Sequence, residues 1–209
     1  MAKKTRKKAS TQTVRKIATQ SRTTKTALPQ AKKPRAPVKA VVSKTASAKA
    51  EQTHVLSEGT AAPAFRILRD DGDSVSLKDF AGRNLVLYFY PRANTPGCTL
   101  EAADFTRLAP QFETLDTAIL GVSADSQAAL QRFRKKHDLD IGLASDETLA
   151  MLKAYGVWGQ KSFMGRTFDG ILRTTVWIGP KGKTVRIWRN VKVAGHAEDV
   201  LAAIRSAFS

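Results

Sequence analysis

Short apolar runs alternate with amphipathic segments along residues 55–209, and this alternation predicts an α/β domain. The run NLVLYFY (84–90) is typical of a strand buried on both faces of a parallel sheet. A helical period begins near Leu100, and Asp125 and Asp146, at later strand-to-helix turns, are expected to be helix caps. Further strands and helices are expected at 118–124, 128–139, 143–145 and 147–157. This order predicts a sheet with helices on both faces.

The C-terminal part of the chain departs from that rhythm. RTTVWIGPKGKTVRIW (173–188) holds two alternating strands around a Gly-Pro-Lys-Gly turn, which predicts a hairpin and therefore a mixed sheet. The last segment, 196–208, is an amphipathic helix with Phe208 on its inward face. The glycine-punctuated stretch KSFMGRTFDG (161–170) is interpreted as a lid or contact loop.

Charge divides the chain into two parts. Residues 1–50 contain 15 Lys and Arg and no Asp or Glu, whereas residues 51–209 contain 20 basic and 18 acidic residues. The first part repeats Lys, Ala, Thr, Ser and Pro, so it has too little apolar area to offset an ordering cost of about 1–2 kcal/mol per residue. We therefore expect a disordered basic tail (1–50) followed by one globular domain (55–209).

The sequence has features of a soluble protein in a reducing compartment. The tail lacks the apolar core of a secretory signal, and no apolar run approaches the roughly 18 residues that span a bilayer. Cys98 is the only cysteine, so no intrachain disulfide can form, and its thiol serves either chemistry or packing.

Cys98 follows Pro-Gly, just after the end of a predicted central strand and at the start of a helix. Open α/β sheets place their chemistry at that edge, and the N–H groups and positive dipole end of a helix favour thiolate over thiol. A single cysteine is often only a small buried hydrophobe. The strand-to-helix position and the hydroxyl of Thr95, three residues earlier, favour a reactive thiol instead.

The stretch YPRANTPGC (90–98) resembles the active-site motif of the peroxiredoxins, Pro-x-x-x-Thr-x-x-Cys. TPGCT followed by Glu-Ala, with GVWGQKSFMGRTFDGILRTTVWI (156–178) downstream, is similar to the bacterioferritin comigratory, or Q-type, subfamily. The resemblance runs from about Glu58 to the last helix. It implies a thioredoxin-like fold and peroxidase activity with hydrogen peroxide and organic hydroperoxides.

The resemblance also implies roles for four residues. Cys98 would be the peroxidatic cysteine, whose thiolate attacks a peroxide oxygen and becomes a sulfenic acid. Thr95 would hydrogen-bond the thiolate and the peroxide, and Pro91 would shield the pocket. Arg173 would supply a fixed positive charge that stabilises the thiolate. Without the motif, Arg173 would be interpreted as a solvated arginine at a strand end, and Thr95 as a helix-terminal hydroxyl.

Ala103 departs from the family pattern. Many Q-type members have a resolving cysteine five residues after the peroxidatic one, where this chain has alanine. We therefore expect a one-cysteine cycle in which an outside thiol, such as thioredoxin, a glutaredoxin or glutathione, reduces the sulfenate. The three histidines follow no metal-ligand spacing, so no metal and no cofactor is expected.

The basic tail carries no aromatic residues, so it would bind nucleic-acid phosphates without reading bases. Three interpretations stay open: a DNA contact, an organelle transit peptide, and a solvated tail without a partner. The dominance of Lys over Arg argues against a transit peptide. Candidate phosphate-binding residues are Lys3, Lys4, Arg6, Lys7, Lys8, Lys32, Lys33 and Arg35.

The sequence therefore predicts a monomeric, thiol-dependent peroxidase without a membrane span. We expect it in the cytoplasm, associated with the nucleoid or nucleus through its tail, or in an organelle if the tail is a transit peptide. The alternative function is a nucleic-acid-binding protein that keeps a peroxiredoxin scaffold with little turnover.

Overall fold

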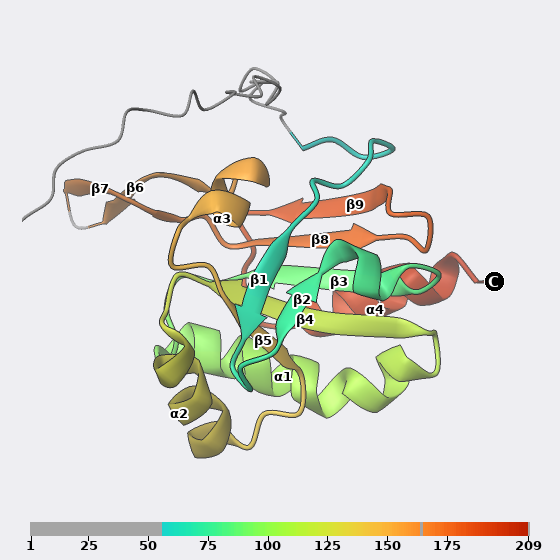
Figure 1. Ribbon diagram of the computed structural model, residues 1–209, viewed down its shortest axis with the longest axis horizontal. Helices are drawn as coiled ribbons and strands as arrows, with labels where there is room; N and C mark the ends of the chain where they lie inside the picture. The colour runs from blue at the N-terminus through green and yellow to red at the C-terminus, as the bar shows by residue number, and fades with distance from the viewer. Residues whose placement is uncertain (1–55, 164, 209) are drawn as a thin grey trace, which may run out of the picture. The chain divides into compact units, whose positions relative to one another are not determined.

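The computed structural model describes residues 56–163 and 165–208, so the predicted basic tail lies outside the described residues. A seven-stranded mixed sheet forms the centre, with a separate two-stranded sheet beside it (Figure 1). The strands are β1 (Arg66–Arg69), β2 (Ser74–Ser76), β3 (Asn84–Phe89), β4 (Thr117–Ser123), β5 (Gly142–Ser145), β6 (Trp158–Phe163), β7 (Arg166–Ile171), β8 (Thr174–Ile178) and β9 (Thr184–Arg189). The helices are α1 (Pro96–Glu113), α2 (Gln127–His137), α3 (Ala150–Ala154) and α4 (His196–Ser206), with a 3-10 turn at Leu77–Phe80.

The sheet order is β2-β1-β5-β4-β3-β8-β9. β3, β4 and β5 run parallel, whereas β8 pairs antiparallel with β3 and places Thr174 opposite Phe89. This pairing brings the start of β8 to the end of β3, where the chain turns into α1. The mixed sheet and the β8–β9 hairpin confirm the prediction.

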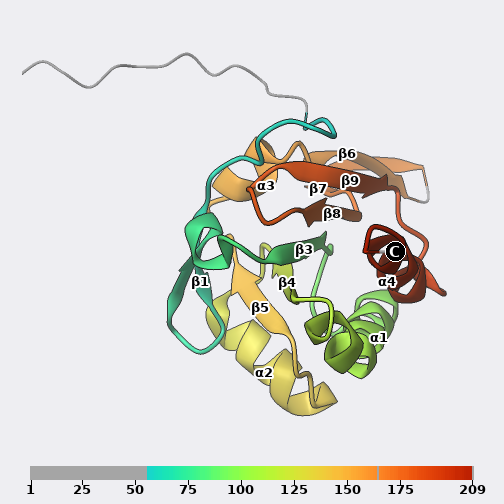
Figure 2. The same ribbon diagram turned by 90° about the vertical axis from the view of Figure 1, so that its right-hand side faces the viewer.

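Side chains of β3 alternate between two cores. Val86 and Tyr88 pack with α1, α2 and α4 on one face, while Leu85, Leu87 and Phe89 pack with α3 and the first described residues on the other. All six residues of β3 are buried, as expected for a strand covered on both faces. Figure 2 shows α1, α2 and α4 together on one side of the sheet.

Two details differ from the sequence-based expectation. Residues 161–170 are not a loop, because they belong to the antiparallel β6–β7 hairpin, in which Lys161 pairs with Phe168. Phe208 does not face inward: α4 ends at Ser206, and Phe208 is 59% exposed. The loop was predicted at 161–170 because glycines interrupt the alternation of apolar and polar residues in the β6–β7 hairpin.

The two predicted aspartate caps have different roles. Asp146 accepts a hydrogen bond from the Leu152 N–H (2.8 Å), so it satisfies a first-turn donor of α3 from outside the helix. Asp125 does not cap α2, which begins after Ser126. Its carboxylate instead accepts hydrogen bonds from the Ala93 N–H (2.7 Å) and from a neighbouring serine hydroxyl.

The described residues offer neither a membrane-spanning helix nor a metal-binding cluster. None of their helices is long and apolar enough to cross a bilayer. Their His, Cys, Asp and Glu side chains form no group of three or more that could hold a metal ion.

Candidate active site

Cys98 lies in the first turn of α1, directly beyond the end of β3. Pro96 begins the helix, and the first intrahelical bond runs from the Thr99 N–H to the Thr95 carbonyl. The N–H groups of Gly97 and Cys98 therefore precede the helical ladder and point toward the N-terminal end. The Cys98 side chain is only 1% exposed and packs among the apolar residues under α1. The sulfur thus sits in a dry environment at the positive end of a long helix.

Arg173 supplies a cation to this buried sulfur. It follows the β6–β7 hairpin and immediately precedes β8, and the pairing of β8 with β3 places it beside α1. Its Nη2 donates a hydrogen bond to Cys98 Sγ at 3.1 Å. The Arg173 side chain is 16% exposed, so water screens its charge weakly, and the guanidinium favours negative charge on the sulfur.

Glu101 holds the other side of the same guanidinium. It lies three residues after Cys98, on the same face of α1, and its Oε2 accepts a hydrogen bond from Arg173 Nη1. Burial raises the pKa of the Glu101 carboxyl to about 7, and the charge of Arg173 opposes that rise. Among the described residues, Glu101 Oε1 is buried without a hydrogen-bond partner. Arg173 is therefore positioned between the sulfur and a buried carboxyl group.

Thr95 and Pro91 lie in the turn before α1, and both are half-buried. Thr95 occupies the N-cap position, but its hydroxyl makes no capping bond and donates instead to the Arg92 carbonyl (3.0 Å). The hydrogen bond that Cys98 receives in the described structure comes from Arg173. Contact of Thr95 with thiolate or peroxide, and shielding by Pro91, stay predictions.

This turn is tied to its neighbours on two sides. Asp125, after β4, accepts the bond from the Ala93 N–H, and the Asn94 side chain lies 3.1 Å from His137 Nε2 at the end of α2. Asn94 itself has a φ of 60°, a left-handed conformation that asparagine tolerates better than most residues. These contacts fix the path from β3 to Cys98.

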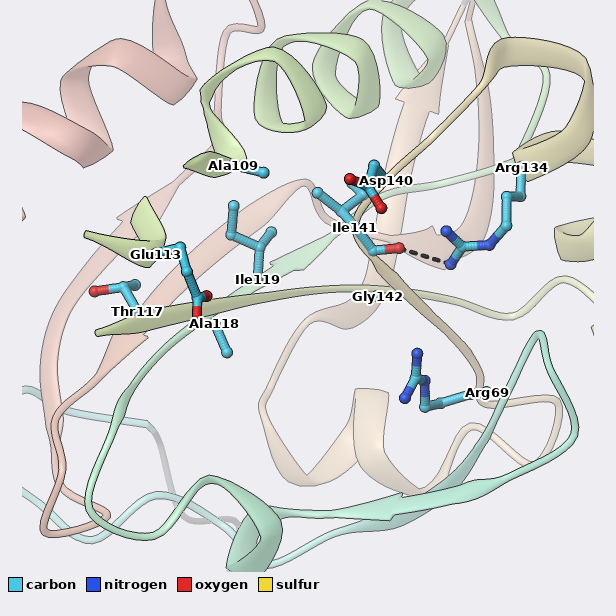
Figure 3. A pocket seen from close by; sticks show the side chains of 10 residues that line it. All are labelled: Arg69, Ala109, Glu113, Thr117, Ala118, Ile119, Arg134, Asp140, Ile141 and Gly142. Atoms are coloured by element: carbon cyan, nitrogen blue, oxygen red, sulfur yellow. Dashed lines mark hydrogen bonds between the residues drawn. The ribbon is translucent and has the colours of Figure 1, made fainter. Parts of the chain in front are cut away.

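A separate pocket lies near the starts of the parallel strands β4 and β5, at the other end of these strands from Cys98. It has a volume of about 270 Å³ and is lined by the start of β4, the start of β5 and the C-terminal part of α1. Arg69 and Arg134 enter it, and Arg134 donates to the Ile141 carbonyl at 2.6 Å (Figure 3). Its lining contains no cysteine, so it is distinct from the Cys98 site.

Sequence reasoning missed Glu101 and Asp125 as parts of this site. The signal for Glu101 was its spacing of three residues from Cys98, which places both on one helix face. For Asp125 no local signal existed, because its partner Ala93 lies 32 residues away.

Comparisons with known proteins agree with this geometry. The family model described as AhpC/TSA family matches residues 59–187. The putative peroxiredoxin bcp of Haemophilus influenzae is 38% identical over 151 residues, which cover 72% of this chain and 97% of the relative. Peroxiredoxin Bcp of Bacillus subtilis is 40% identical over 147 residues, which cover 70% and 94%.

Solved structures show the same relationship. The bacterioferritin comigratory protein of Xanthomonas campestris aligns with a TM-score of 0.66 at 39% identity, covering 69% of this chain and 92% of that one. A cysteine-to-serine mutant of Xylella fastidiosa PrxQ aligns with a TM-score of 0.68 at 34% identity, covering 73% and 99%. These likenesses confirm the predicted thioredoxin-like peroxiredoxin fold.

Replacing Arg173 by methionine should slow the reaction of Cys98 and also destabilise the protein. A charge-assisted hydrogen bond is worth about 1.5–3 kcal/mol, so alkylation of Cys98 by iodoacetamide at neutral pH should slow by about tenfold to a hundredfold. The same change removes the cation that lowers the pKa of the buried Glu101 carboxyl, so this group becomes a protonated acid without its partner, at a cost of about 1–3 kcal/mol in the free energy of unfolding. Mass spectrometry measures alkylation, and urea unfolding measures stability.

The double variant Arg173→Met/Glu101→Gln separates these two effects. It replaces the unpaired ionisable carboxyl by an uncharged amide, so it should regain the part of the lost stability that comes from Glu101 while its alkylation stays slow. Recovery of the parent alkylation rate in the double variant would show that Arg173 acts only by holding the structure.

Proposed function

The chain belongs to the AhpC/TSA family and, within it, to the Bcp or Q-type peroxiredoxins, which are thiol-dependent peroxidases, and we propose that this member works by a one-cysteine cycle centred on Cys98. The observation that carries the proposal is the bond from Arg173 to the buried sulfur of the only cysteine. A nucleophilic thiolate needs such a cation in a dry site.

In the first half-reaction, the Cys98 thiolate attacks one oxygen of the hydroperoxide. An S–O bond forms as the O–O bond breaks, so the sulfur is oxidised to a sulfenic acid and the peroxide is reduced. The leaving alkoxide or hydroxide takes a proton and departs as alcohol or water. Arg173 stabilises the initial thiolate and then the negative charge that develops on the leaving oxygen.

In the second half-reaction, an outside thiol attacks the sulfenic sulfur. Water leaves and a mixed disulfide forms, and a second thiol then releases the Cys98 thiol and a disulfide product. We propose thioredoxin, a glutaredoxin or glutathione as this reductant. For the first half-reaction, alkyl hydroperoxides are proposed beside hydrogen peroxide, because the similar Xanthomonas campestris protein was studied for its alkyl peroxide reduction activity.

The shape of α1 supports a cycle without a resolving cysteine in the same chain. Ala103 is exposed on a helix that runs unbroken from Pro96 to Glu113. Residues five positions apart on a helix are separated by about 7.5 Å along its axis, which exceeds the usual Cα separation of a disulfide. A bridge between these positions would require local unwinding. With alanine at position 103, the cycle makes no such demand on α1.

The proposed cycle predicts a specific oxidation product. One equivalent of hydrogen peroxide should add one oxygen atom to the reduced protein at Cys98, and glutathione should then convert this product to a mixed disulfide. Intact-mass spectrometry measures both steps, and Cys98→Ser should show neither. A stable covalent homodimer as the main product in solution would contradict the cycle.

We also propose that residues 1–50 bind DNA without sequence preference and hold the enzyme near the nucleoid. The support is the segregation of charge: 15 basic and no acidic residues in this segment. Such a segment binds phosphates by releasing counterions. The competing possibilities are a cleaved targeting peptide, and a DNA-binding protein on a peroxiredoxin scaffold with little turnover.

Deleting residues 1–50 tests the tail. The shortened chain (51–209) should keep peroxide consumption and lose most of its retention on duplex DNA, because the tail holds most of the net charge. Electrophoretic mobility shift and peroxide assays measure the two properties. Finding that the mature protein in cells starts after residue 50 would end the tether proposal. If the shortened chain loses DNA retention and cells with Cys98→Ser behave like the parent, the protein is a DNA-binding protein on a peroxiredoxin scaffold with little turnover.

A further inference from the structure

Positive charge is concentrated in one part of the folded domain. Between Ile171 and Ala197 the chain has six basic residues and no acidic one, whereas the remainder of residues 51–209 has 14 basic and 18 acidic residues. Apart from Arg173, these basic residues are exposed and lie on or next to β9. They are Lys181, Lys183, Arg186, Arg189 and Lys192, here called the β9 cations.

The β9 cations are not neutralised by the rest of the described domain. The ion pairs that the described residues form involve Arg69, Arg83, Arg107, Arg134 and Arg173, and none of the β9 cations. The Arg186 guanidinium lies over the Trp188 ring, 4.9 Å from its centroid, and the residue is exposed. Arg186 and Arg189 are three residues apart, so they point to opposite faces of the sheet, and the Glu58 carboxylate also lies on β9. The excess of positive charge therefore follows the edge strand and suits a polyanion that lies along this edge.

The main chain of β9 offers no free pairing edge along most of its length. β9 is the last strand of the sheet, but the segment before β1 covers it. The Thr184 N–H donates to the Thr60 carbonyl (2.8 Å), and the Ile187 N–H donates to Glu58 Oε1 (2.9 Å). An incoming strand therefore finds these donors already occupied. Recognition at this edge depends on the cationic side chains.

The length of this edge spans several phosphate charges of duplex DNA. From Lys183 to Arg189 the strand extends about 20 Å at about 3.3 Å per residue, and a duplex carries one phosphate charge per about 1.7 Å of axis. Arg189 Nη2 donates to the carbonyl of Leu56 (2.8 Å), the first described residue.

We propose that the β9 cations form a phosphate-binding surface for duplex DNA on the folded domain. This inference deepens the proposed DNA contact of residues 1–50, and it rests on folded residues of its own. Figure 1 shows β9 at the rim of the sheet, away from α2, and Figure 2 shows the same separation.

The experiment uses the full chain and two matched triple variants. The test variant is Lys181→Gln/Lys183→Gln/Arg186→Gln. The control is Arg132→Gln/Lys135→Gln/Lys136→Gln, which also removes three positive charges, from exposed positions on α2. Fluorescence anisotropy measures the affinity for a mixed-sequence duplex of about 30 base pairs at several salt concentrations between about 50 and 200 mM.

Each lost phosphate contact lowers the steepness of log K against log salt by about 0.9. The test variant should therefore lose about 2–3 in slope and bind more weakly, while the control keeps the parent slope. Both variants should keep the parent unfolding temperature and peroxide consumption, because the substituted residues lie outside the Cys98 site.

Three results would overturn the proposed DNA surface. If the parent binds DNA and both triple variants keep its slope, or lose it equally, the β9 cations are not the contact and only the tail proposal survives. If the test variant loses affinity for a polyglutamate peptide and not for DNA, the surface serves an acidic protein segment instead. If the parent itself binds no DNA, both DNA proposals fail, and the peroxidase proposal is unaffected.

Discussion

The buried guanidinium of Arg173 is the charge on which the rest of the site depends. It donates to the Cys98 sulfur on one side and to Glu101 on the other, and both partners are 1% exposed. Burying these groups is costly unless each finds its partner, so the fold must deliver all three to one place. The antiparallel pairing of β8 with β3 does this, because it sets Arg173 beside the first turn of α1.

The Cys98 site lies apart from the pocket near Arg69 and Arg134 and from the β9 cations. Cys98 lies where β3 ends and α1 begins, while the pocket between Arg69 and Arg134 lies at the other end of the parallel strands and the cations of β9 lie along the rim of the sheet. In the proposed cycle, Ala103 leaves α1 without a second cysteine that would have to reach Cys98. A DNA contact at β9 would leave the first turn of α1 unchanged.

Much of this could be predicted from the sequence, for identifiable reasons. The apolar run 84–90 and the Pro-Gly before Cys98 are local signals, and the structure has a buried strand and a helix start at these positions. The role of Glu101 was not foreseen, because a glutamate in the first turns of a helix usually faces water. The loop predicted at 161–170 was wrong, since its strands pair with each other rather than with the main sheet.

Peroxide consumption by the full-length protein with a panel of thiol reductants, beside Cys98→Ser, tests the central claim most directly. The account predicts turnover with at least one of thioredoxin, glutaredoxin or glutathione, and none in the variant. Turnover that persists in Cys98→Ser, or no turnover by the parent with any reductant, would contradict a one-cysteine peroxidase.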